Sequence, residues 1–187
     1  DAHSLPSARS QGEPMTGRFN LTSGASFEHV VMGEDAQVLL MASDAGYGFI
    51  TDFKDLVSKN KNGKALVSVP KGGVLLSPVR VNDVASDYCM AISNEGRMLL
   101  FPLRDLPKLG KGKGNKIINI PSARAKAREE FVTLLAIVPD GASVTLHAGR
   151  RKLTLKATDI DHYRGERGRR GNKLPRGLQR VDEAVVE

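Results

Sequence analysis

A pattern of about fifty residues recurs three times along the chain and carries a turn glycine at the same place each time. The turn glycines are Gly46, Gly96 and Gly149, which lie 50 and 53 residues apart. An Asp-Leu or Asp-Ile pair follows each turn, beginning at Asp55, Asp105 and Asp159. Such a period predicts a propeller or a linear array, because one unit cannot bury its apolar faces without a neighbour.

Short runs rich in Val, Ile, Leu and Met fill each repeat and are bounded by Gly, Asn, Asp and Pro. This pattern is typical of β-strands. The predicted strands are 27–32, 37–43, 46–51 and 64–69 in the first repeat, 74–81, 88–93, 97–101 and 116–120 in the second, and 131–138, 143–147, 151–156 and 176–185 in the third. Four antiparallel strands at this period match a propeller blade, so we expect an all-β, propeller-like disc.

The repeat predicts one domain over residues 1–187, with blades at about 22–70, 71–121 and 131–187. Residues 1–21 look like the tail of an earlier blade, since Gly12, Gly63 and Gly114 are each 51 residues apart. We therefore expect three full blades and a partial one, truncated at the N-terminal side, in an open disc. Residues 122–130 hold good helix formers throughout and predict a helical or flexible connector.

A basic, glycine-rich loop follows each Asp-Leu or Asp-Ile pair, at 59–64, 110–116 and 165–173. Residues 104–180 contain 19 Lys and Arg against 7 Asp and Glu, a net charge of +12, in a chain whose net charge is +7. Exposed backbone N–H groups and basic side chains together hold phosphate oxygens without reading base sequence. A solvated, solubilising surface is the alternative, and recurrence in one structural position favours phosphate binding.

The basic residues of these loops are the first candidates for phosphate contacts: Lys59, Lys61, Lys64, Lys108, Lys111, Lys113, Lys116, Arg164, Arg167, Arg169, Arg170 and Lys173. Basic residues at the blade turns are second candidates: Arg97, Arg150, Arg151 and Lys152. Aromatic residues are few and Trp is absent, which weakens any model of single-stranded nucleic-acid binding by base stacking.

Motifs of enzyme chemistry are missing from the sequence. A P-loop fails because Asn115 stands five positions after Gly110, where the motif needs glycine. The four histidines are scattered and predict no metal site. Cys89, the single cysteine, lies in an apolar run and is expected to be a buried thiol in a reducing compartment. No run approaches the roughly 18 apolar residues that span a bilayer, and Asp1 suggests a piece of a longer protein.

Five segments resemble a known family: 41–49, 96–103, 110–121, 165–171 and 176–180. They are similar to the C-terminal domain of the A subunit of bacterial DNA topoisomerase IV and, more distantly, to that of the gyrase A subunit. The resemblance covers about residues 5–185. It implies a β-pinwheel, in which propeller-like blades exchange a strand with their neighbours, and double-stranded DNA lying against a basic outer rim.

The resemblance also implies a role. The domain would bind and bend the transported DNA segment for ATP-dependent relaxation and decatenation by the whole enzyme. Strand cleavage would belong to the N-terminal part of the subunit, since Tyr47, Tyr88 and Tyr163 lack the Arg-Tyr-Thr context of the active-site tyrosine. We therefore expect no enzyme activity and no cofactor in this domain, while the whole enzyme uses ATP and Mg²⁺.

Partners and location follow from the same resemblance. Expected partners are double-stranded DNA, the B subunit of topoisomerase IV, which hydrolyses ATP, and the N-terminal part of the same subunit. The expected location is the bacterial cytoplasm at the nucleoid, without membrane insertion.

The sequence departs from the family pattern in two ways. Neither 110–114 nor 165–171 reproduces the Gln-Arg-Arg-Gly-Gly-Lys-Gly box of gyrase, and the family's domain has more blades than the repeats found in this sequence.

Two other functions stay open on the sequence. The first is a propeller-like scaffold whose basic loops dock acidic protein partners. The second is RNA binding through backbone contacts, which the scarcity of aromatic stacking platforms disfavours. A mobility-shift titration with duplex DNA separates the scaffold from the DNA-binding module.

Overall fold

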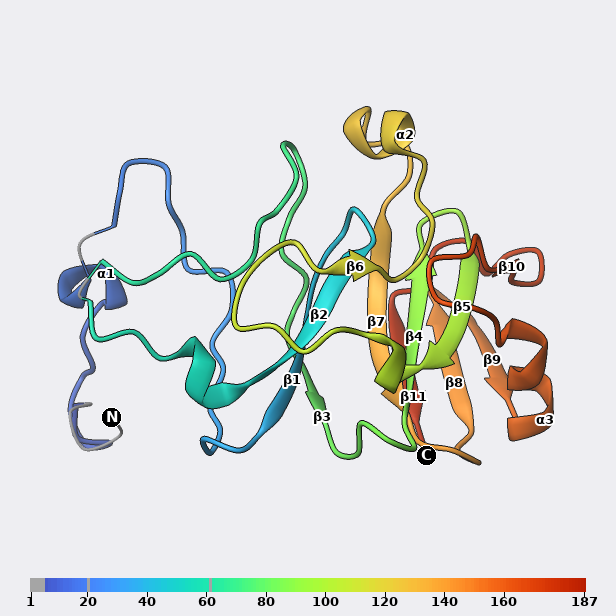
Figure 1. The fold of residues 1–187 in the computed structure, drawn as a ribbon, viewed down its shortest axis with the longest axis horizontal. Helices are drawn as coiled ribbons and strands as arrows, with labels where there is room; N and C mark the ends of the chain where they lie inside the picture. Colours follow the sequence, from blue (N-terminus) through green and yellow to red (C-terminus); the bar gives the residue numbers. More distant parts are fainter. Residues whose placement is uncertain (1–5, 20, 61) are drawn as a thin grey trace.

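Each of three sheets contains one antiparallel β-hairpin in the computed structural model, which describes residues 6–19, 21–60 and 62–187 (Figure 1). Gly46, Gly96 and Gly149 lie in the hairpin turns with φ of 82°, 66° and 55°. Glycine adopts this left-handed backbone at little cost, whereas a side chain opposes it. The predicted hairpins are thus confirmed as β1 (Val38–Ser43) with β2 (Tyr47–Asp52), β4 (Tyr88–Ser93) with β5 (Arg97–Pro102), and β8 (Val144–Ala148) with β9 (Arg151–Leu155).

The outer strands of each sheet come from later in the chain. In the first sheet β3 (Val79–Val81) pairs with β1, and β6 (Asn115–Lys116) pairs with β2. In the second sheet β7 (Val132–Val138) pairs with β4, and β10 (Asn172–Lys173) pairs with β5. The third sheet has the order β11-β8-β9 among the described residues, with β11 at Glu183–Val186.

The first two sheets therefore combine a hairpin from one repeat with two outer strands from the next. The first sheet spans the repeat limit near residue 70, and the second sheet spans the limit near residue 130. This is the exchange of strands that a pinwheel requires. The predicted all-β class is confirmed, since each helix of the described residues has only three to five residues.

Several predicted outer strands are wrong in length or absent. Residues 27–32 form no strand, and Val30 and Met32 are each 72% exposed, so no neighbouring sheet covers them. Residues 64–69 make only an isolated bridge between Val67 and Gly112. The predicted strand 74–81 is shortened to β3. The predicted strand 116–120 is replaced by the two-residue β6, which shares only Lys116 with it, and 176–185 is replaced by β11, which shares residues 183–185 with it.

A short helical turn follows the second strand of each hairpin and contains the recurrent Asp-Leu or Asp-Ile pair or its aspartate. They are η2 (Phe53–Leu56), η3 (Leu103–Asp105), and α3 (Ala157–Ile160) continued by η4 (Asp161–Tyr163). One further turn, α2 (Ser122–Lys126), lies within the predicted connector, and α1 (Met15–Arg18) lies near the N-terminus. No helix of the described residues is long and apolar enough to cross a membrane.

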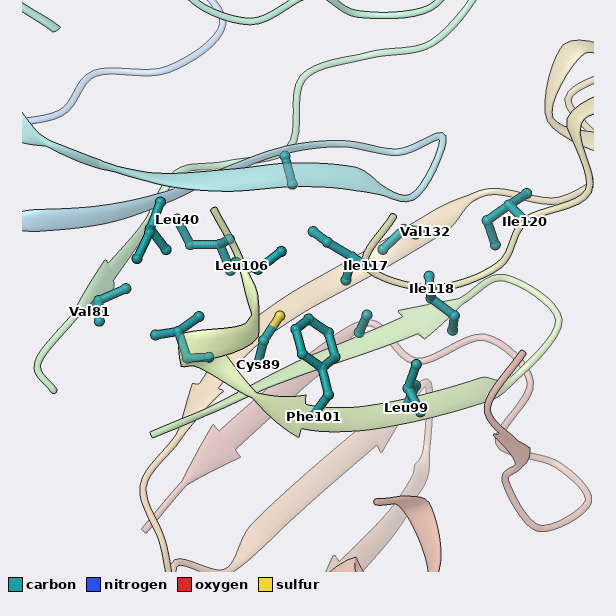
Figure 2. Close-up of a cluster of buried hydrophobic side chains, with 14 residues drawn as sticks. Leu40, Val81, Cys89, Leu99, Phe101, Leu106, Ile117, Ile118, Ile120 and Val132 are labelled. Atoms are coloured by element: carbon teal, nitrogen blue, oxygen red, sulfur yellow. The ribbon is translucent and has the colours of Figure 1, made fainter. Parts of the chain in front are cut away.

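The second sheet is buried on both faces, which makes it the centre of the domain. Cys89 and Phe101 face the first sheet and pack with Leu40 from β1 and with Ile117 and its neighbours after β6 (Figure 2). The opposite face packs against the third sheet through residues that alternate with these: Met90, Ile92, Met98 and Leu100. Cys89 is 0% exposed, and burial raises the pKa of its thiol, so the predicted buried thiol is confirmed.

Candidate nucleic-acid interface

Three basic loops leave the helical turns and run along the sheets: residues 59–69, 108–119 and 164–173. The second and third loops are anchored in the same way, each on the hairpin of the repeat before its own. Leu109 N–H donates to Ile50 O at 2.9 Å, and Gly165 N–H donates to Leu100 O at 2.9 Å. Further along, Ile117 N–H and Leu174 N–H each donate, at 2.8 Å, to the carbonyl of a hairpin-turn glycine. The repeat therefore places each of these two loops in an equivalent position.

A Gly-Asn-Lys sequence makes the edge strand in both loops, and its glycine is required by close contact. Gly114 and Gly171 have φ of 75° and 72°. A Cβ at Gly171 would lie 2.6 Å from the carbonyl oxygen of Met98, and one at Gly114 would overlap the carbonyl of Gly48. Glycine thus lets the loop backbone lie directly against the hairpin.

The three loops are joined to one another in chain order. Gly112 N–H donates to Leu66 O at 2.7 Å, which links the first loop to the second. Gly168 N–H donates to Ile117 O at 2.9 Å, and Asn119 N–H donates to Arg169 O at 2.9 Å, which links the second to the third. We call the joined loops 59–69, 108–119 and 164–173 the basic rim.

Some predicted phosphate contacts are exposed cations whose side chains make no hydrogen bond or ion pair within the described part of the chain. They are Lys59, Lys64, Lys111, Lys173, Arg150 and Lys152. Lys113 is also exposed, and its Nζ lies 3.7 Å from the ring centroid of Tyr47. These lysines and arginines present their full charge to solvent. Lys61, another candidate, lies outside the described residues.

Other predicted contacts are exposed but engaged by acids. Lys108 Nζ lies 2.7 Å from Asp52 Oδ1, and this contact holds the pKa of Asp52 below its usual value. Arg164 pairs with Asp140 and Asp161, and its guanidinium lies 4.3 Å from the ring centroid of Tyr88. Arg169 pairs with Glu166 at 2.7 Å, both largely in solvent.

A last group is half-buried or bonded to backbone and supports the loops themselves. Arg97 donates to Gly171 O at 3.1 Å, and Arg151 donates to Arg176 O at 3.2 Å. Lys116 Nζ donates to Asn119 Oδ1 at 3.0 Å. Arg167 donates to the backbone of Lys116, and Arg170 pairs with Glu130. The structure brings all these candidates to the loops and turns, but gives them different roles.

Sequence reasoning missed two buried carboxylates that pair with arginines. Glu130 is 0% exposed and pairs with Arg124 and Arg170, and Asp44 is 1% exposed and pairs with Arg128. Asp44 also accepts a hydrogen bond from Val74 N–H at 2.9 Å. Arg128 and Arg124 belong to the connector 122–130. The pair of Arg128 with Asp44 fastens the connector to the first hairpin turn, and the pair of Arg124 with Glu95, at 3.0 Å, fastens it to the second. The only signal was the position of Glu130 directly before an apolar strand.

Arginines at the third hairpin turn were also missed. Arg180 lines a shallow hollow of about 430 Å³ together with Gly149, Gly177 and Asp182. Arg151 and the exposed Arg176 lie beside it, since Arg151 donates to the carbonyl of Arg176. Their signal was the high charge of residues 150–180, which sequence reasoning assigned only to the loop and the turn.

No group of three or more His, Cys, Asp or Glu within residues 6–19, 21–60 and 62–187 could hold a metal ion. The tyrosines are occupied by packing. Tyr163 is buried, which together with nearby Asp159 raises its pKa, while Tyr47 and Tyr88 lie under Lys113 and Arg164. The surface chemistry that the described residues offer is thus a line of cations and backbone amides.

The arrangement of exchanged four-stranded sheets matches known proteins. The family model described as the DNA gyrase C-terminal domain, a β-propeller, matches residues 37–82 and 87–137. The chain belongs to the DNA gyrase C-terminal domain family. Among solved structures of this family, the chain is similar to the E. coli ParC C-terminal domain, with a TM-score of 0.93 and 50% identity over 100% of this chain and 75% of that one.

Curated relatives of this chain support the same family membership. The A subunit of DNA topoisomerase 4 from Pseudomonas aeruginosa is 57% identical over 186 residues, and that from Escherichia coli K12 is 51% identical over 187. The matches cover 100% of this chain and 25% of each relative, so the chain spans about a quarter of their length. The resemblance predicted from the sequence is confirmed. The gyrase A C-terminal domain, at 13% identity and a TM-score of 0.69, shares the fold.

Proposed function

We propose that this chain is a DNA-binding module of a type IIA topoisomerase, which holds double-stranded DNA along the basic rim. The observation that carries the proposal is the joining of the three loops by backbone hydrogen bonds into one line, with unpaired lysines along it in the described part of the chain. Phosphates of a duplex form a similar regular line of charge, and cations with amide donors hold it without base readout.

Within the whole enzyme, the module would position the DNA segment to be transported during ATP-dependent relaxation and decatenation. Support comes from the relatives named as the A subunit of DNA topoisomerase 4, of whose length this chain covers 25%. In this proposal the N-terminal part of that subunit cleaves DNA, and the B subunit hydrolyses ATP in the presence of Mg²⁺. The domain itself needs no cofactor and works at the bacterial nucleoid.

The experiment is a salt series of duplex titrations with two matched double variants. Lys111→Gln with Lys113→Gln removes two exposed charges from the second loop. Lys126→Gln with Lys156→Gln removes two exposed charges outside the loops. Each phosphate contact contributes about 0.9 to the slope of log K against log salt. We expect the loop variant to lose up to about 1.8 from the slope and the control to lose almost nothing.

Equal slopes for the parent and the loop variant would exclude the second loop as the contact. Absence of duplex binding by the parent chain at low salt would favour the alternative, a scaffold for acidic protein partners. The same titration with A-form RNA duplex tests the remaining alternative, because a module built for B-form spacing should bind it more weakly.

A further inference from the structure

Glu130 is a fully buried carboxylate at the joint between the second and third loops. Its Oε2 accepts a hydrogen bond from Arg170 Nη2 at 2.7 Å, and its Oε1 accepts one from Arg170 Nη1. Arg124 Nη1 forms an ion pair with Oε2 at 3.0 Å. A buried carboxylate is costly unless it is paired and hydrogen-bonded. The two arginines therefore have to stay in place for this part of the chain to keep its structure.

Arg170 connects Glu130 to both loops. It belongs to the third loop, and its Nη1 also donates to Asn119 O at 2.8 Å, at the end of the second loop. Both terminal nitrogens of its guanidinium are thus used inside the protein, and only 30% of the side chain is exposed. A cation held in this way is poorly placed to meet a phosphate.

The neighbouring contacts strengthen the same joint. Arg167 Nη1 donates to Lys116 O at 2.7 Å, beside the two backbone bonds made by Gly168 and Asn119. The joint between the first and second loops differs. It has the bond from Gly112 to Leu66 O and one from Ser68 N–H to Gly112 O at 2.9 Å, with no ion pair recorded across it in the described residues.

We infer that Arg170, together with Glu130 and Arg124, is a positioning residue that fixes the third loop against the second and so aligns Lys113 and Lys173 on one DNA path. The inference rests on the proposed function for its DNA part. It assigns to Arg170 a role other than the phosphate contact predicted from sequence. Lys173, three residues later and without a recorded partner among the described residues, is the contact that the third loop offers.

The first arm of the test needs no DNA. Amide hydrogen exchange is measured at Gly168 and Asn119, whose N–H groups donate across the joint. Arg170→Gln should accelerate exchange at both amides by about tenfold or more, since local opening becomes easier. Lys173→Gln, the matched control, removes the same charge from the same loop and should leave both rates unchanged. Equal rates in the two variants would overturn the inference.

The second arm measures a change in duplex affinity whose direction is opposite to the one that net charge alone predicts. Glu130→Gln makes the protein more positive, so simple attraction to DNA predicts tighter binding. Our inference predicts severalfold weaker duplex binding, because the loops lose alignment. Amide exchange in β4 confirms that the variant is folded. Tighter or unchanged binding by a folded Glu130→Gln variant would overturn the inference.

Arg170→Lys supplies a milder variant that keeps the charge. Lysine cannot reproduce the two-pronged contact of the guanidinium with a carboxylate. We expect Arg170→Lys and Arg170→Gln both to weaken duplex binding. Retention of parental affinity by Arg170→Lys would identify Arg170 as a direct phosphate contact. If the parent chain binds no DNA, the proposed function fails while the exchange arm still decides whether Arg170 fixes the joint.

Discussion

At the scale of single residues, cations of the same type have different roles that depend on their neighbours. Lys111 and Lys173 point their charge at solvent, whereas Lys108 is held by Asp52 and Arg170 by Glu130. The sequence predicted that these residues gather on recurring loops, because loop position follows from the repeat. It could not separate free from engaged cations, because the acids that pair with them come from distant parts of the chain.

The contact between Lys108 and Asp52 predicts a pH effect at one residue. The hydrogen bond from Lys108 is the largest cause that lowers the pKa of Asp52 from 3.8, and Lys54 adds a smaller one. We expect Lys108→Gln to raise the pKa of Asp52 toward 3.8, and Lys54→Gln to raise it less. The pH dependence of the Asp52 carboxyl carbon shift measures both.

The lowered pKa of Asp52 also fixes how its contribution to the unfolding free energy changes with pH. A carboxyl whose pKa is lower in the folded state stabilises the fold above its unfolded value and loses that contribution as pH falls through the folded value. Parent and Lys108→Gln should therefore differ in unfolding free energy near neutral pH and converge once Asp52 is protonated. An unchanged carboxyl titration in Lys108→Gln would show that the pair does not persist in solution.

At the scale of elements, hairpins were predictable and exchanged strands were not. A hairpin is local, and glycine at Gly46 or Gly96 with flanking apolar runs specifies it. β6 has only two residues and pairs with β2, which lies far earlier in the chain. No local pattern encodes that choice. Ile117 and Ile118, buried directly after β6, hold the segment in place by packing rather than by a ladder.

Close contact at Gly171 gives a test of the exchanged strand. Gly171→Ala and Gly63→Ala impose the same backbone strain, since φ is 72° and 71°, but a Cβ at Gly63 meets no atom within 4 Å. We expect Gly63→Ala to cost about 1–2 kcal/mol. Gly171→Ala should cost about 1–3 kcal/mol more, because the Cβ forces β10 away from β5. Urea unfolding measures both.

The matched pair also separates strain from contact. Equal losses in the two variants would mean that the backbone at Met98 moves aside without cost, which would contradict tight pairing of β10 with β5. A larger loss in Gly171→Ala, with faster amide exchange along β5, would locate the effect at the strand edge.

At the scale of the whole molecule, the second sheet joins the domain into one unit because it is buried on both faces. Cys89 lies between the first and second sheets with no exposed surface, and burial raises the pKa of its thiol. A thiol with a raised pKa and no access to solvent reacts only when the sheets separate.

Thiol labelling therefore reports on separation of the sheets. We expect Cys89 to be unreactive in the native protein at mildly alkaline pH and to react at the rate of unfolding when denaturant is added. A variant with Cys89→Ala and Ser122→Cys carries its thiol on the exposed α2 turn and should react at once. Rapid labelling of Cys89 without denaturant would show that the first two sheets open independently of global unfolding.

The crossing of strands between repeats has a consequence for how such a domain can change its length. A fifty-residue unit inserted by duplication brings its own hairpin, two strands that complete its predecessor's sheet, and one loop for the rim. Because the outer strands and the rim loop of each unit pair with the unit before it, whole segments could be gained or lost while these strand pairings and loop links are kept. The length of DNA that the proposed rim could hold would then change in steps.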